Sequence, residues 1–138
     1  MTIWLPTHIK QPHLSKTCGQ HCVAMLCDIP VKQAIKDVGK SGGTYWKDLL
    51  PVFNKYRWVT KQKSLFRFSR GGTDPLIALI KSWNGLGNDT HWMLKYKSFL
   101  YDPSDFVIKY WPGEKYYSFN RLSNQRRITS YLELFKED

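Results

Sequence analysis

Apolar side chains recur at helical spacing in three stretches of the first 56 residues, each bounded by turn or capping residues. We predict helices at residues 18–26, 31–38 and 45–56. Gly39 ends the second helix, because glycine readily takes the left-handed conformation that closes helices. Pro51 is expected to kink the third helix or to end its first half, since proline lacks the amide hydrogen that a helix needs.

From about residue 58 the spacing of apolar residues changes to that of strands. Strands are expected near residue 59 and at residues 63–68, 75–80, 91–96, 99–101 and 106–111. A tight turn at Lys97-Ser98 joins two of them into a hairpin. The tail, 128–135, fits either a closing strand or a short helix. Helices followed by an antiparallel sheet, with no repeat or linker, predict a single α+β domain spanning residues 1–138.

The composition agrees with one globular domain and indicates in which cell compartment it occurs. The chain has 138 residues, 42% of them hydrophobic, and no run of about 18 apolar residues that could cross a membrane. Its start lacks the long apolar stretch of a signal peptide. Its cysteines, Cys18, Cys22 and Cys27, crowd into one predicted helix, where a disulfide would require distortion. We therefore expect a reduced, cytoplasmic protein that does not bind membranes.

The formal net charge is +10, from 21 lysines and arginines against 11 aspartates and glutamates. Such an excess favours acidic partners, either nucleic acid or an acidic protein surface. It also occurs in small domains for solubility alone, so the charge does not choose between these interpretations.

Candidate chemistry begins at Cys18, the first residue of the first predicted helix, with Thr17 before it as a capping residue. A thiol there lies at the positive end of the helix dipole, where free N–H groups favour the thiolate. This makes Cys18 a candidate nucleophile, although an unreactive cysteine is also a common small core residue.

A candidate base lies in the predicted hairpin. His91 begins its first strand and Asp102 ends its second, so pairing would bring both side chains to one edge of the sheet. There the imidazole could take the thiol proton while the carboxylate holds the tautomer and orientation of the ring. Taken singly, His91 could instead be a structural histidine, and Asp102 a turn residue before proline.

Together these residues resemble the papain-like cysteine peptidases, most closely the small bacterial C39-type branch that includes bacteriocin-leader processing domains. The resemblance covers roughly residues 8–110. The shared order is a glutamine, a Cys-Gly at the start of the central helix, a Gly-Gly-Thr turn, a strand that opens with histidine, and an Asp-Pro. Here these are Gln11, Cys18-Gly19, Gly42-Gly43-Thr44, His91-Trp92 and Asp102-Pro103.

The resemblance implies a papain-like fold, in which an N-terminal helical part carrying the cysteine packs on a C-terminal antiparallel sheet carrying His and Asp. It makes Cys18 the nucleophile, His91 the general base and acid, and Asp102 the residue that orients the imidazole. Gln11 would donate to the oxyanion beside the backbone N–H of Cys18. The implied activity is cysteine peptidase-like hydrolysis of an amide or isopeptide bond in a peptide or protein, without a cofactor. Proteolysis, deamidation and acyl transfer share this triad and stay open, and the charge suggests an acidic substrate.

Other residues near the candidate nucleophile could fill the same roles. Gln20 is a rival oxyanion donor, and His13 and His21 are rival bases. Positions 20 and 21 are expected to face away from the thiol on the helix. Cys22 and Cys27 are interpreted as core thiols.

Two interpretations without this chemistry stay open. One is a non-catalytic binding module for nucleic acid or an acidic protein, built on basic and aromatic residues from residue 58 onward. The basic members are Lys61, Lys63, Arg67, Arg70, Arg121, Arg126 and Arg127, and the aromatic members are Trp58, Phe66, Phe68, Tyr116, Tyr117 and Phe119. The other is a zinc site made of the three cysteines and His21. The Cys-x3-Cys-x4-Cys spacing differs from the Cys-x2-Cys of structural zinc sites, so we expect no metal.

Overall fold

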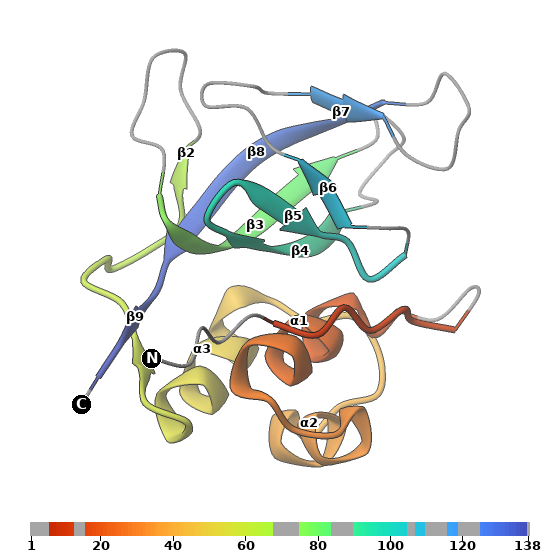
Figure 1. Cartoon of the computed structure of the whole chain (residues 1–138). Coiled ribbons are helices and arrows are strands. Elements are labelled where there is room, and N and C mark those ends of the chain that lie inside the picture. Colours follow the sequence, from red (N-terminus) through yellow and green to blue (C-terminus); the bar gives the residue numbers. More distant parts are fainter. Residues whose placement is uncertain are drawn as a thin grey trace, which may run out of the picture.

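The structure of the protein, a computed structural model, consists of a helical layer beneath an antiparallel sheet (Figure 1). It describes residues 6–12, 16–67, 75–83, 90–104, 107–109, 116–118 and 125–137. The helices within these ranges are α1 Cys18–Cys27, α2 Val31–Val38 and α3 Trp46–Lys55. The predicted α+β class and the order of the helices are confirmed. α2 has the predicted bounds and ends at Gly39, whose φ of 81° is left-handed.

α3 continues through Pro51, so the expectation that proline ends the first half of this helix is wrong. Pro51 lies on the exposed face, where its missing N–H leaves one hydrogen bond of the helix unmade. The opposite face buries Leu49, Val52 and Phe53 in the core. Burying such side chains contributes about 1.5–3 kcal/mol each, which together outweighs the roughly 3 kcal/mol cost of an internal proline.

Within the described ranges the strands pair antiparallel, as predicted. The larger sheet has the order β2-β8-β3-β4-β5-β6, with β7 beside β8, and β1 pairs separately with β9 (Figure 1). The bounds are β1 Trp58–Val59, β2 Phe66–Arg67, β3 Ile77–Trp83, β4 Thr90–Tyr96, β5 Phe99–Tyr101, β6 Val107–Lys109, β7 Tyr116–Ser118, β8 Gln125–Glu133 and β9 Phe135–Lys136. The tail is therefore a strand rather than a helix.

Strand bounds differ most from prediction where the chain bends. The strand expected at residues 63–68 is only β2 in the described part of the chain, because bends at residues 61, 63 and 64 precede it. β3 begins at Ile77 rather than at Pro75, because proline has no N–H to donate to a neighbouring strand. β7 was not predicted. The turn at Lys97-Ser98 is as predicted, with Lys97 at a φ of 54°.

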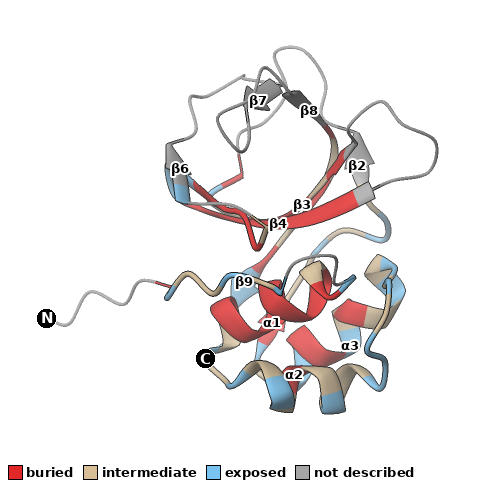
Figure 2. Ribbon diagram, turned by 90° about the vertical axis from the view of Figure 1, so that its right-hand side faces the viewer, coloured by how far each residue is buried: buried red, intermediate tan, exposed pale blue. Residues whose placement is uncertain are grey.

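The centre of the sheet is buried on both faces. Leu79 and Leu94 face the helical layer, whereas Ile80 and Met93 belong to a second apolar cluster on the opposite face. Figure 2 shows the resulting band of buried residues along β3 and β4. Because successive residues point to opposite faces and both faces are dry, β3 begins with a continuous apolar run, Ile77–Ile80, rather than an alternating pattern.

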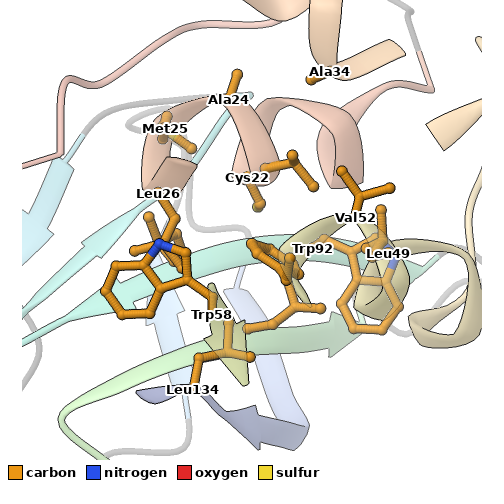
Figure 3. Packing of buried hydrophobic residues seen from close by; sticks show 14 of the residues in the cluster. Cys22, Ala24, Met25, Leu26, Ala34, Leu49, Val52, Trp58, Trp92 and Leu134 are labelled. Carbon is orange, nitrogen blue, oxygen red and sulfur yellow. The ribbon is translucent and has the colours of Figure 1, made fainter. Parts of the chain in front are cut away.

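α1 is the central helix and is almost completely enclosed. Its residues from Gly19 to Leu26 are buried among α2, α3 and β4. Figure 3 shows Cys22 and Leu26 pointing toward Trp92 and Trp58 on the sheet side. This packing fixes the start of α1 against the start of β4. In the described ranges, no helix is long and apolar enough to cross a membrane.

Candidate active site

Cys18 is the first residue of α1 and is half-buried where that helix meets β4. The backbone N–H of Trp92 donates to Cys18 Sγ at a distance of 3.4 Å. Thr17 occupies the N-cap position as expected, but its side chain makes no capping hydrogen bond. The sulfur therefore lies at the positive end of a buried helix, next to an N–H donor that favours the thiolate.

The turn before α3 lies directly against the start of α1. A Cβ atom at Gly19 would be 2.3 Å from Thr44 Oγ1, so glycine is what permits this approach. The indole Nε1 of Trp92 donates to the carbonyl oxygen of Thr44 at 3.0 Å. Trp92 thus contacts the turn through its side chain and the Cys18 thiol through its backbone N–H. The sequence did not reveal this connection between the turn at Thr44, the start of β4 and the start of α1.

His91 and Asp102 lie at the end of the β4–β5 hairpin, next to Cys18. His91 Nε2 is 2.6 Å from Asp102 Oδ1, and both side chains are buried. The Cys18 thiol and the imidazole are also close enough for each to shift the pKa of the other. Because Nε2 is engaged by the carboxylate, Nδ1 is the ring nitrogen left for the thiol. The structure thus brings together the three side chains that the sequence indicated for this chemistry.

The electrostatics of these three groups favour an ion pair. Burial alone raises the pKa of the Cys18 thiol, but the hydrogen bond and positive charge of His91, with the Trp92 N–H, lower it below its usual value. Burial lowers the pKa of His91, yet Asp102 and Cys18 together raise it to about 9. The pKa of Asp102, raised by burial, is brought below its ordinary value by His91 and Ser104. The three shifts therefore all favour the charged forms, namely a thiolate, an imidazolium and a carboxylate.

The other two cysteines lie in surroundings that disfavour the thiolate. Cys22 is fully buried, and burial together with the charges of Cys18 and Asp102 raises its thiol pKa well above the usual value. Burial raises the pKa of Cys27 to about 12, although Lys136 opposes this rise. All three cysteines are free thiols. Only Cys18 among them lies in an environment that favours ionisation.

The extended segment before α1 lies along the turn that carries Asp102. The Gln11 N–H donates to the carbonyl oxygen of Pro103 at 2.6 Å, and His8 Nε2 lies 2.7 Å from the carbonyl oxygen of Asp102. Gln11 is therefore held on the hairpin side of the candidate site. His8 was not anticipated, because nothing in the sequence marks a histidine that contacts a residue 94 positions away.

The rival residues are engaged elsewhere. The side-chain amide of Gln20 donates to the carbonyl oxygens of Lys40 and Gly42, each at 3.0 Å, so it supports the turn before α3. His21 is buried, and its Nδ1 lies 2.7 Å from the carbonyl oxygen of Thr17, one turn back in the same helix. Its pKa is lowered, first of all by burial. His13 lies outside the described residues.

Ser104 was missed by the sequence analysis, yet it contacts both His91 and Asp102. Its Oγ lies 3.2 Å from His91 Nε2 and 3.0 Å from Asp102 Oδ1. The sequence Asp-Pro-Ser does contain a signal, since an aspartate often accepts a hydrogen bond from the backbone two residues further on. That signal predicts a turn but not the contact with the histidine.

The described residues include only part of the groups on which the two interpretations without this chemistry depend. No group of three or more His, Cys, Asp or Glu side chains in them is arranged to hold a metal ion. Trp58 is only 5% exposed, with Lys136 Nζ 5.3 Å from its ring centroid, so it cannot stack on a nucleic-acid base. Several members of the proposed basic and aromatic surface lie outside the described residues, namely Arg70, Arg121, Phe68 and Phe119.

Comparison with known proteins adds no family to this description. No protein-family model matches the sequence, and no curated protein is significantly similar to it.

Proposed function

We propose that this chain is a thiol hydrolase of papain-like arrangement, which cleaves an amide or isopeptide bond of a peptide or protein. The observation that carries the proposal is the grouping of the Cys18 thiol, the His91 imidazole and the buried Asp102 carboxylate, with His91 Nε2 2.6 Å from Asp102 Oδ1. These groups come from the start of a helix and from the end of a hairpin. A nucleophile, a base and a group that orients the base are the parts that acyl transfer requires.

The first half of the reaction forms a thioester. The Cys18 thiolate attacks the substrate carbonyl carbon, and the carbonyl π electrons move to oxygen. The backbone N–H of Cys18 and the side-chain amide of Gln11 donate to this oxyanion. The C–N bond then breaks, and His91 gives its Nδ1 proton to the leaving nitrogen.

The second half releases the product. His91, now neutral, takes a proton from a water molecule that attacks the thioester carbonyl. The C–S bond breaks and the thiolate leaves, so the thiolate–imidazolium pair is restored. Asp102 remains ionised throughout and holds the ring through Nε2. With an amine in place of water, the same steps give transfer instead of hydrolysis.

The net charge supports an acidic peptide or protein as the substrate, and the free cysteines fit a reducing, cytoplasmic setting. The chain carries a net charge of +10, and the exposed Lys16 lies just before the nucleophile. The Lys40 ammonium flanks the turn that contacts Gly19, although it also pairs with Asp48 at 3.0 Å. Such an excess of positive charge concentrates anionic partners near the site.

Incubation with a proteome-derived peptide library tests the proposal. We expect new peptide termini or deamidated products from the wild type and none from Cys18→Ala. Cys27→Ala is a matched control, because it changes a half-buried thiol on the same helix and should retain activity. Identical products from Cys18→Ala, or no products from the wild type, would contradict the proposal.

A further inference from the structure

Ser104 is tied to the candidate site by more contacts than a turn residue needs. Its backbone N–H donates to Asp102 Oδ1 at 2.9 Å, and its hydroxyl donates to the same oxygen at 3.0 Å. The backbone bond alone would form the turn after Asp102. The hydroxyl therefore adds contacts to Asp102 and His91 that the turn itself does not require.

The carboxylate of Asp102 is unevenly satisfied. Oδ1 accepts from His91 Nε2 as well as from both donors of Ser104. Oδ2 is buried and has no hydrogen-bond partner among the described residues. A buried charged oxygen without a partner is unfavourable, so this carboxylate keeps its place through the contacts at Oδ1.

The hydroxyl oxygen also faces the imidazole, at 3.2 Å from His91 Nε2. Because its single hydrogen points to the carboxylate, it presents a lone pair to the Nε2–H group. The Nε2 proton is thus shared between a strong acceptor at 2.6 Å and a weaker one at 3.2 Å. These two contacts at Nε2 limit rotation of the imidazole, and with it the position of Nδ1 relative to Cys18.

We propose that Ser104 is a positioning residue for the thiol chemistry: its hydroxyl fixes Asp102 and His91 so that the ring keeps Nδ1 directed at the Cys18 thiolate. The proposal rests on the function proposed above for Cys18 and His91. Ser104 does not touch the reacting atoms and acts only through its two neighbours. Its loss should weaken the ion pair without removing any member of it.

The test is the pH dependence of Cys18 alkylation by iodoacetamide in Ser104→Ala, Ser104→Thr and wild type. Ser104→Ala keeps the backbone N–H and loses only the hydroxyl contacts. We expect it to react about tenfold more slowly at pH 6, the scale of one hydrogen bond to a charged group, with its apparent thiol pKa moved upward. Ser104→Thr keeps a hydroxyl and should restore most of the rate.

Two controls separate positioning from loss of structure. Ser98→Ala changes an exposed serine in the β4–β5 turn and should behave as wild type. Cys22 is 0% exposed, so its labelling reports unfolding in any variant. Slow labelling of Cys18 with Cys22 still protected would support positioning.

The outcomes distinguish this inference from the proposed function. If Ser104→Ala matches the wild-type profile while His91→Ala alters it, the role of Ser104 is refuted and the proposed function stands. If Ser104→Thr is as slow as Ser104→Ala, the hydroxyl is not the active feature and the inference also fails. If wild-type Cys18 behaves as an ordinary thiol that ignores His91, both proposals fail.

Discussion

Replacing Gly19 by alanine tests the close contact between α1 and the turn that precedes α3. The added Cβ would lie 2.3 Å from Thr44 Oγ1 and 3.0 Å and 3.2 Å from the two methyl carbons of Leu49. Leu49 is fully buried, and the carbonyl of Thr44 is held by the Trp92 indole at 3.0 Å. Leu49 therefore cannot move aside without disturbing other packed groups, and the backbone that carries the Thr44 side chain is fixed.

Two effects of this substitution oppose each other. Alanine favours a helix over glycine by about 1 kcal/mol. Overpacking a well-filled core costs typically about 1–3 kcal/mol. Because the nearest contact is far shorter than real Cβ contacts allow, we place the cost at the upper end and expect a net loss of about 1–2 kcal/mol.

Chemical unfolding followed by tryptophan fluorescence measures this difference in the free energy of unfolding. Gly43→Ala is a matched control, because nothing lies within 4 Å of its added Cβ and it should be nearly neutral. Combining Gly19→Ala with Thr44→Ala removes the shortest contact and should recover part of the loss. If Gly19→Ala were as stable as the wild type or more stable, the close packing described for this turn would be refuted.

Three further predictions concern the site. Asp102→Asn keeps a hydrogen-bond acceptor for His91 but removes the negative charge, so the pKa of His91 should fall from about 9 toward 6.5. NMR titration of the imidazole measures this pKa, and an unchanged value would contradict the role given to the carboxylate. Gln11→Ala should lower kcat by about 100-fold or more with little change in KM, as expected for loss of an oxyanion donor, once a substrate is found; a change confined to KM would contradict this. Because the folded state holds the His91 proton more tightly than the unfolded state, the raised pKa should add to the free energy of unfolding. This contribution, on the order of 3 kcal/mol, should be complete below pH 6.5 and lost as the pH rises through about 9. His91→Ala should lack this contribution in pH-dependent unfolding, and a constant gap between the two proteins across this range would refute it.

The helices were predictable because their signals are local. The helix at 31–38 needs only its own apolar spacing and Gly39, and the structure has the same bounds. The prediction at Pro51 was wrong because the burial of one face of α3 outweighs the local preference of proline against helix. The short strand β7 depends on pairing with β8, far along the chain, and its sequence shows no alternation that would reveal it.

The candidate site was predictable where its residues sit at the ends of local elements. Cys18 at a helix start and His91 at a strand start were visible for that reason. The contacts of Ser104 and His8 were not, because they depend on how a turn and an extended segment meet in three dimensions. The same holds for Gly19, whose need for close approach appears only once the turn before α3 is in place.

The central claim is that Cys18 is a thiolate paired with His91, and pH-dependent alkylation mapped by mass spectrometry tests it most directly. In the wild type, Cys18 should react with an apparent pKa below the usual value of about 8.5, while Cys22 and Cys27 stay nearly unlabelled. In His91→Ala the apparent pKa of Cys18 should rise. A Cys18 that reacts no faster than Cys27, or whose profile is the same without His91, would contradict the account.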